Sequence, residues 1–277
     1  MNLKNKISVI VAIYKDINAL DLILQSLYNQ TYTGEYEVIV AEDGEDPAVE
    51  TFIETLKYPN LIHAKQKDEG WRKNKSLNNA IRRSSGDLII FVDGDCVPYD
   101  NFIENYTKQQ EEKKVLCGRR VELGPKYSKK LRDKEVSMKN IQSSYLKLFG
   151  KMRKDGARHY EEGIVLNAFF HNLKYRKKES HILGCNFALN RKDLYDINGF
   201  NEEYHNPSVG EDTDIEHRLS QIGCVMKPVR NLCNVLHLHH IEKYDAQANA
   251  RSRAVFEKIK KENQIVCQHG LNQSSNN

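Results

Sequence analysis

Short aliphatic runs recur along the first 95 residues of the chain. Each is four to seven residues long, rich in β-branched side chains and bounded by polar or turn-forming residues. Runs of this length and composition are typical of strands that are buried on both faces of a sheet. We therefore predict strands over residues 7–13, 36–41, 61–64 and 88–92.

The segments between these runs place apolar residues at every third or fourth position, which is the spacing of one helical face. Asn18 is the expected N-cap of the first helix, and Asp46-Pro47, a cap followed by a first-turn proline, begins the second. A third helix passes through residues 77–81. The predicted apolar stripes are Leu20, Ile23, Leu24, Leu27, Val49, Phe52, Ile53, Leu56, Leu77, Ala80 and Ile81.

Alternating strands and helices predict an α/β fold with a mostly parallel central sheet, flanked by helices that form right-handed crossovers. Ligands of such sheets bind beyond the carboxyl ends of the strands. Three polar segments follow directly after predicted strands: Tyr14-Lys15, Glu42-Asp43-Gly44 and Asp93-Gly94-Asp95. We expect these segments to meet at one crevice.

The second half of the chain is less regular. We predict strands over 115–121, 186–189 and 235–238. Helices are expected over 191–197 and 212–222, each closed by a glycine, and a terminal helix over 246–261. A helical insertion is expected near 126–182, within one domain.

Composition narrows the function classes. The 277 residues are 39% hydrophobic and 29% charged, which excludes a collagen-like or mostly disordered chain. The net charge of +4 does not indicate a nucleic-acid partner. The six scattered cysteines are expected to be reduced and mostly buried. Neither a signal peptide nor a membrane-spanning apolar run is evident, so we expect a cytoplasmic protein.

Asp93-Gly94-Asp95 is a candidate metal site, because two carboxylates separated by glycine can both approach a hard divalent cation such as Mg²⁺ or Mn²⁺. An Asp-Gly turn without a metal is the structural alternative. The segment 236–240 carries His237, His239 and His240, which are either packing residues or ligands that would favour Mn²⁺.

Asp212 is a candidate general base, since a carboxylate at a helix start can accept a proton from a substrate hydroxyl. Helix-end donors are expected to favour its charged form. Helix capping is the alternative role for the acidic cluster 211–214. The basic segment 70–75, at the start of the third helix, is either a phosphate-binding site or a solvated turn around Trp71.

The segment 126–154 contains ten Lys and Arg residues and only two acidic ones. Ile141, Tyr145, Leu148 and Met152 recur at helical spacing within it. Such a basic amphipathic helix either lies on an anionic membrane surface, giving a peripheral location at the inner face of the cell membrane, or packs on the domain with its charges solvated.

Together these segments resemble the motifs of the family 2 glycosyltransferases of the GT-A, nucleotide-diphospho-sugar transferase fold. The resemblance is strongest to bacterial capsule and lipopolysaccharide enzymes and to chondroitin-polymerase modules. It rests on ISVIVAIYKD, VIVAEDGED, GWRKNKSLNNAI and LIIFVDGDCVP in order. The segment 184–219 resembles the C-terminal segment of β-1,4-galactosyltransferases, but Ser208-Val209 stand where those enzymes carry a tryptophan.

The resemblance implies a GT-A domain over 1–240 and a helical tail over 241–277. Its parts would be a nucleotide-sugar half, a basic helical insertion and an acceptor half, at 1–125, 126–182 and 183–240. Tyr14 and Asp43 would hold the uracil and ribose of a UDP-sugar, and Lys73 would lie near the uracil or the phosphates.

The resemblance also implies that Asp93 and Asp95 bind Mn²⁺ or Mg²⁺ and the nucleotide-sugar, with Gly94 between them. The late histidine ligand would be His240 or, second, His237. Asp212 would be the catalytic base, and Glu211 would contact the acceptor or the donor sugar.

The implied reaction transfers a hexose or N-acetylhexosamine, with galactose and N-acetylgalactosamine as first guesses, to a hydroxyl of a saccharide or lipid-linked saccharide, with inversion. This would serve surface polysaccharide or lipopolysaccharide synthesis. One alternative is a sugar nucleotidyltransferase, although those enzymes have a glycine-rich loop where this chain has Tyr14-Lys15-Asp16. The other is a non-catalytic protein that binds glycans or nucleotide-sugars.

Overall fold

The computed structural model describes residues 6–206, 211–241 and 245–272. Its main sheet has seven strands in the order β3-β2-β1-β4-β8-β6-β9. Strands β3, β2, β1 and β4 run parallel to one another, whereas β8 runs antiparallel to both β4 and β6. The mostly parallel α/β sheet is therefore confirmed. The strands are β1 (Ile7–Ile13), β2 (Tyr36–Glu42), β3 (Leu61–Lys65), β4 (Leu88–Asp93), β6 (Lys114–Cys117), β8 (Asn186–Asn190) and β9 (Val225–Pro228).

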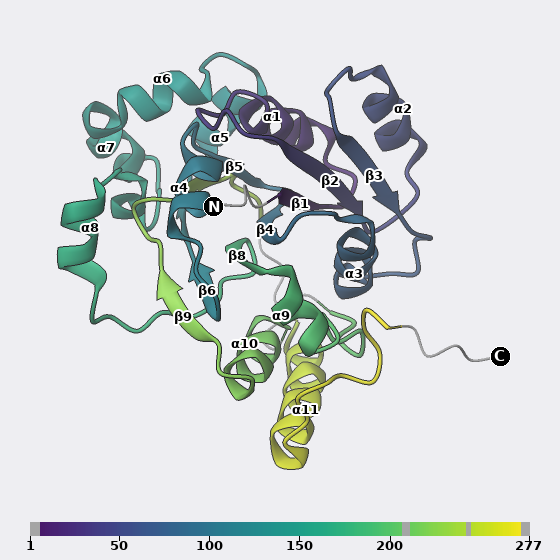
Figure 1. Cartoon of the computed structure of the whole chain (residues 1–277). Coiled ribbons are helices and arrows are strands. Elements are labelled where there is room, and N and C mark those ends of the chain that lie inside the picture. Colours follow the sequence, from purple (N-terminus) through teal and green to yellow (C-terminus); the bar gives the residue numbers. More distant parts are fainter. Residues whose placement is uncertain (1–5, 207–210, 242–244, 273–277) are drawn as a thin grey trace.

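Both faces of this sheet are covered. Since side chains alternate along each strand, successive residues of one strand pack into opposite clusters. In β1, Val9 and Val11 belong to one buried cluster, which includes α1 (Ile17–Leu27). Ile10 belongs to the opposite cluster, which includes α3 (Lys73–Arg83). Figure 1 shows α1 and α3 on different sides of the sheet, and α2 (Pro47–Thr55) beside β3.

The predicted caps differ in outcome. Asp46 caps α2 as expected, and its side chain accepts a hydrogen bond from the Ala48 amide. Asn18 is wrong as the cap of α1, since it lies inside the helix. Asp16 is the cap instead, because its carboxylate accepts from the Ala19 amide and so starts the helix earlier.

A second, three-stranded sheet has the order β5-β10-β7. Its strands are β5 (Cys96–Pro98), β7 (Arg119–Glu122) and β10 (Asn234–His237). The single strand predicted over 115–121 is wrong, because the chain passes from the main sheet to this one at Gly118. A Cβ atom on Gly118 would lie 2.3 Å from the Asn186 side chain, so the crossing requires glycine.

The predicted insertion is helical, but its basic part is three helices rather than one. They are α5 (Pro125–Arg132), α6 (Met138–Ser143) and α7 (Tyr145–Lys154). Ile141, Tyr145 and Met152 are buried in the main core. The predicted apolar stripe therefore packs on the domain and does not face a membrane. After α7 come a 3₁₀ turn (Tyr160–Gly163) and α8 (Ala168–Tyr175).

The remaining helices are α4 (Phe102–Gln109), α9 (Arg191–Asp196), α10 (Glu211–Gln221) and α11 (Ala246–Glu262). The last three gather beyond one end of the sheet (Figure 1). All six cysteines are free and buried, as expected. Among the described residues, no helix has the length and apolar character that crossing a bilayer requires.

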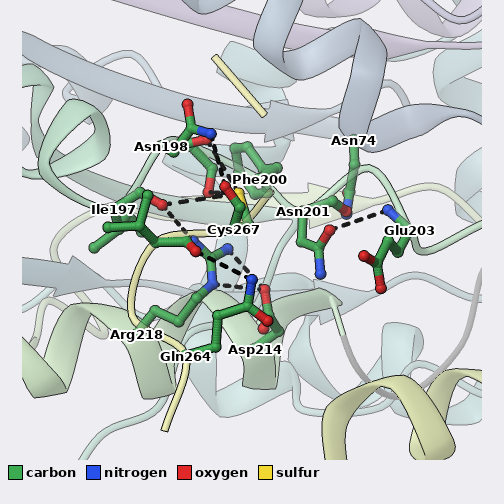
Figure 2. Close-up of polar contacts among 12 residues, drawn as sticks. Asn74, Ile197, Asn198, Phe200, Asn201, Glu203, Asp214, Arg218, Gln264 and Cys267 are labelled. Atoms are coloured by element: carbon green, nitrogen blue, oxygen red, sulfur yellow. Dashed lines mark hydrogen bonds and ion pairs between the residues drawn. The ribbon is translucent and has the colours of Figure 1, made fainter. Parts of the chain in front are cut away.

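A buried ion pair holds α10 in place (Figure 2). Arg218 donates from Nε and Nη2 to Asp214, at 2.9 and 2.7 Å, and from Nη1 to the Ile197 carbonyl at 2.8 Å. Both side chains are at most 1% exposed. Asp214, in the acidic cluster 211–214, is therefore a structural residue.

Arg218→Ala is expected to lower the free energy of unfolding by about 3–5 kcal/mol, because it leaves the Asp214 carboxylate buried without its partner. Chemical denaturation measures this change. Lys192→Ala, which removes an exposed partner of Asp196, is the control and should cost less than about 1 kcal/mol. A cost for Arg218→Ala no larger than that of the control would contradict the structural role.

Candidate active site

The carboxyl ends of three strands meet at one edge of the main sheet. The register pairs Ile13 with Glu42 and Ala12 with Asp93, so the residues that follow β1, β2 and β4 are neighbours. They border a cavity of about 560 Å³, which we call the strand-end cavity. Its lining includes the predicted residues Tyr14, Asp43, Lys73, Asp93, Gly94, Asp95 and His240.

Asp43 is buried, and both its oxygens are oriented by neighbours. Oδ1 accepts from the Gln66 side chain at 2.8 Å, and Oδ2 accepts from the Arg72 backbone amide at 2.7 Å. The second bond ties the carboxylate to the start of α3. Tyr14 is 55% exposed at the rim, where its hydroxyl donates to Asp68 at 3.2 Å. An exposed ring beside a fixed carboxylate suits a flat, hydrogen-bonding ligand such as a nucleobase.

Lys73 begins α3 and forms an ion pair with Asp93, 2.8 Å from Nζ to Oδ1. Both side chains are partly exposed toward the cavity. Gly94 follows Asp93 and packs directly against β1. A Cβ atom on Gly94 would lie 2.5 Å from the Ala12 carbonyl oxygen. The glycine therefore lets the Asp93–Asp95 backbone approach the sheet.

Tertiary structure brings the late histidines to Asp95. Strand β10 pairs antiparallel with β5 so that His237 lies opposite Cys96, and the Leu238 amide donates to the Asp95 carbonyl at 2.8 Å. The chain then turns, with the His239 amide bonded to Ser128. As a result, Nε2 of His237 and Nε2 of His240 lie 3.2 and 3.1 Å from Asp95 Oδ2.

These three side chains fit a divalent cation. Two imidazole nitrogens lie beside one oxygen of the Asp95 carboxylate, and a carboxylate with two imidazoles is a donor set that suits Mn²⁺. Burial disfavours the charged form of Asp95, but its hydrogen bonds with both histidines hold the pKa of the carboxyl far below its usual value. Cys96 Sγ lies within 4.8 Å of the ligand atoms of Asp95 and His237, although burial raises the pKa of that thiol.

Asp212 lies at the start of α10 and accepts from the Gly184 amide at 2.8 Å. Asp212 is not among the described residues that line the strand-end cavity. Lys73 and Asp93 do line it, and their charges act on the Asp212 carboxyl. Burial raises the pKa of Asp212, with Lys73 and the Gly184 amide opposing. The Gly184 amide favours the charged form, as expected of a donor at this position, but desolvation is the larger influence and the net shift is upward. The side chain of Glu211 lies outside the described part of the chain.

Some site residues had no sequence motif of their own. Arg132, from the end of α5, lines the strand-end cavity and donates to both oxygens of Asp16, at 2.9 and 2.8 Å. Asp16 and Trp71 also line the cavity. Asp16 directly follows Tyr14-Lys15 and Trp71 lies in the basic segment 70–75, so the sequence could have indicated both. It could not have indicated Arg132, because that residue is one of ten basic residues in its segment.

A family model described as glycosyl transferase family 2 matches residues 8–197. The chain belongs to this family. A second model, described as the N-terminal domain of galactosyltransferase, matches residues 165–241. The two matches overlap over residues 165–197. The strand-end motifs lie in the first match, and the α10 and histidine segments lie in the second.

Among its relatives, this family 2 chain is 26% identical to the uncharacterized glycosyltransferase YfnE of Bacillus subtilis, over 85% of this chain and 65% of that protein. It is 24% identical to the chondroitin synthase of Escherichia coli, over 80% of this chain and 33% of that protein. The chain thus covers less than two thirds of either relative.

Solved structures support the GT-A fold. Staphylococcus aureus TarS (residues 1–349) in complex with UDP-GlcNAc has a TM-score of 0.57 at 16% identity, over 86% of this chain and 60% of that one. The mannosyltransferase PcManGT of Pyrobaculum calidifontis, in complex with GDP-Man and Mn²⁺, has a TM-score of 0.57 at 14% identity, over 88% and 59%.

Gly94→Ala is expected to lower stability by about 1–3 kcal/mol and to weaken UDP binding in Mn²⁺, because the added Cβ must push Asp93–Asp95 away from β1. Denaturation and calorimetric titration measure the two effects. Gly150→Ala is the matched control, since a Cβ there meets nothing within 4 Å. Wild-type stability and UDP affinity in Gly94→Ala would show that close backbone approach is not required.

Proposed function

We propose that the chain transfers a hexose or N-acetylhexosamine from a UDP-sugar to a saccharide hydroxyl, in surface polysaccharide or lipopolysaccharide synthesis. The observation that carries this proposal is the convergence of Asp43, Lys73, Asp93 and Asp95 on the strand-end cavity, with Asp212 under the influence of the same charges. Family membership supports sugar transfer over the nucleotidyltransferase alternative.

In the proposed donor site, Asp43 accepts hydrogen bonds from the uridine, and the Tyr14 ring packs on the uracil. Lys73 places its ammonium group beside the diphosphate. Arg132, held by Asp16 through both terminal nitrogens, adds a guanidinium whose remaining N–H groups can donate to a phosphate. These cationic groups hold the donor and stabilise charge on the leaving diphosphate.

Asp95, His237 and His240 would hold Mn²⁺ or Mg²⁺, with Asp93 close by. When bound, the cation adds positive charge at the diphosphate. The Mn²⁺ in the PcManGT structure supports this expectation.

Asp212 takes the proton from the attacking acceptor hydroxyl, and its raised pKa makes it a stronger base than an exposed aspartate. Because the acceptor attacks the face opposite the leaving diphosphate, we propose inversion of the anomeric centre. Glu211 stays a candidate for contact with the acceptor or the donor sugar.

The test is a panel of UDP-galactose, UDP-N-acetylgalactosamine, UDP-glucose and UDP-N-acetylglucosamine with Mn²⁺, with and without chelator. UDP release and thermal stabilisation are measured together. We expect one donor to give both responses, and chelator to abolish them. Binding of no UDP-sugar under any of these conditions would reject the proposal.

A further inference from the structure

A second cavity, of about 320 Å³, lies along β7 and is lined mainly by charged side chains. Three arginines line it, from β7 and from the segment after β9, together with two glutamates. We call it the arginine cavity; its charged lining residues are Arg119, Arg120, Glu122, Glu162 and Arg230.

The carboxylates of this cavity are already paired. Glu122 contacts Arg120 at 3.2 Å and Arg158 at 2.5 Å, and Glu162 contacts Arg230. Arg119 differs, because its guanidinium donates to the carbonyl oxygens of Gly118 and His181, at 2.8 and 2.9 Å. Among the described residues it pairs with no carboxylate. The cavity therefore holds more positive than negative charge.

The positive charges of Arg119 and Arg230 repel each other. Burial and the nearby charge of Arg119 lower the pKa of Arg230, whose Nε atom has no hydrogen-bond partner among the described residues. Bringing a negatively charged group into the cavity would relieve the repulsion, give the Arg119 guanidinium a charged partner and offer an acceptor to the Nε atom of Arg230.

The arginine cavity adjoins Asp212. Ile182 and Leu183 line it, and the next residue, Gly184, donates its amide to Asp212. Arg120 in the arginine cavity and Lys73 in the strand-end cavity both act electrostatically on the Asp212 carboxyl. Asp212 is thus within electrostatic reach of two cavities that share no lining residue.

We propose that the arginine cavity binds an anionic group of the acceptor, a carboxylate or a phosphate, and so directs a neighbouring hydroxyl toward Asp212. This inference rests on the proposed function, since it names the acceptor class of the same enzyme. The acceptor would be an acidic glycan or a polyol-phosphate chain rather than a neutral saccharide.

The test compares three acceptor probes with the donor found in the panel. They are a glucuronate-containing tetrasaccharide, the same tetrasaccharide with its carboxyls reduced to alcohols, and a ribitol-phosphate tetramer. Transfer and direct binding, by calorimetry without donor, are measured for each. We expect at least one anionic probe to bind about tenfold or more tightly than the reduced tetrasaccharide, and to react about tenfold or more faster. Which anionic probe is preferred tells whether the cavity recognises a carboxylate or a phosphate.

Arg119→Gln isolates the site, because it leaves no carboxylate without a partner. We expect KM for the anionic acceptor to rise about tenfold or more, with KM for the UDP-sugar unchanged, and Arg119→Lys to restore part of the loss. Arg83→Gln, which changes an exposed arginine on α3, controls for net charge. Equal binding of reduced and anionic probes, or a similar KM in Arg119→Gln, overturns the inference. Because binding is measured without donor, these results are distinct from failure of the transfer reaction.

A separate surface carries a second inference. Helix α8 is anchored inward by His171 and Tyr175, which are buried. Its outer face presents Phe169, Phe170 and Leu173, which are 72%, 54% and 76% exposed. Four exposed basic residues adjoin them: Lys174, Arg176, Lys177 and Lys178. Exposed aromatic and aliphatic side chains of this size on a single helix mark an interaction surface.

Charge decides which partner fits this α8 surface. Its basic residues complement anionic lipid headgroups, and its apolar side chains can enter the headgroup–acyl boundary. Tyr175 also contacts Arg230, 5.5 Å from ring centroid to guanidinium carbon, so α8 adjoins the arginine cavity. We infer that α8 binds an anionic bilayer surface peripherally. The predicted stripe over 126–154 has no part in this contact, because it is buried.

Vesicle sedimentation tests the second inference. We expect the full chain to sediment with vesicles of 70% phosphatidylcholine and 30% phosphatidylglycerol at low salt, and not with pure phosphatidylcholine. Leu173→Glu should reduce sedimentation several-fold, whereas Val266→Glu, at a position 53% exposed elsewhere, should not. Failure to sediment, equal loss in both variants, or self-association of the wild type through α8 in sedimentation velocity would overturn it.

Discussion

Asp95→Asn is expected to reduce sugar transfer about 10²–10³-fold, the range typical when one charge-stabilising group is lost. The substitution keeps the shape of the side chain but removes the carboxylate on which the Nε2 atoms of His237 and His240 converge. The cation would then lose its charged ligand, and the diphosphate would lose stabilisation as it leaves. Initial rates at saturating donor and acceptor measure the effect.

UDP affinity with and without Mn²⁺ provides an independent readout for Asp95. In the wild type we expect Mn²⁺ to strengthen UDP binding, and in Asp95→Asn we expect this dependence to disappear. Asp196→Asn makes the same chemical change outside the cavity and should behave as the wild type. Unchanged turnover together with unchanged Mn²⁺ dependence in Asp95→Asn would remove Asp95 from the metal site.

Asp212→Asn is expected to reduce transfer about 10²–10⁴-fold while leaving UDP affinity unchanged, because the amide cannot accept the proton of the acceptor hydroxyl. Asparagine can still accept the hydrogen bond from the Gly184 amide, so α10 should keep its place. Steady-state rates and calorimetric titration of UDP separate the two effects.

Gly184→Ala tests whether the position of the Asp212 carboxylate matters as well as its charge. A Cβ atom there would lie 2.4 Å from Asp212 Oδ1, so the side chain must move. We expect a loss of turnover with UDP affinity retained, as for Asp212→Asn. If UDP affinity collapses in either variant, Asp212 supports the nucleotide site; if turnover persists in Asp212→Asn, another group is the base.

Local sequence rules succeed where neighbouring residues decide the structure. The strands β1 and β4 and the start of α2 at Asp46-Pro47 follow from β-branched runs and capping chemistry, which act within a few residues. The convergence of Tyr14, Asp43 and Asp93 also follows, since parallel strands point the same way. The strand predicted over 115–121 fails because Asn186, far along the chain, decides where the strand divides.

The two alternatives for the basic segment 126–154 could not be separated from the sequence for a related reason. The spacing of Ile141, Tyr145 and Met152 defines an apolar stripe, but the same spacing serves a helix that packs on its own domain and one that lies on a lipid surface. Burial in the main core settles the choice. The exposed apolar face belongs to α8, whose exposure depends on what the rest of the fold covers.

The sequence alone determined which residue types could carry chemistry, where the strands end and in which order the motifs follow. These features depend only on side-chain identity and local periodicity. The fold decided which histidines approach Asp95: the antiparallel register of β10 with β5 and the turn after Leu238 bring in both His237 and His240. It also decided the pKa of Asp212 and the place of Arg132. Burial and contacts between distant residues arise only when the chain is packed, so no local pattern encodes them.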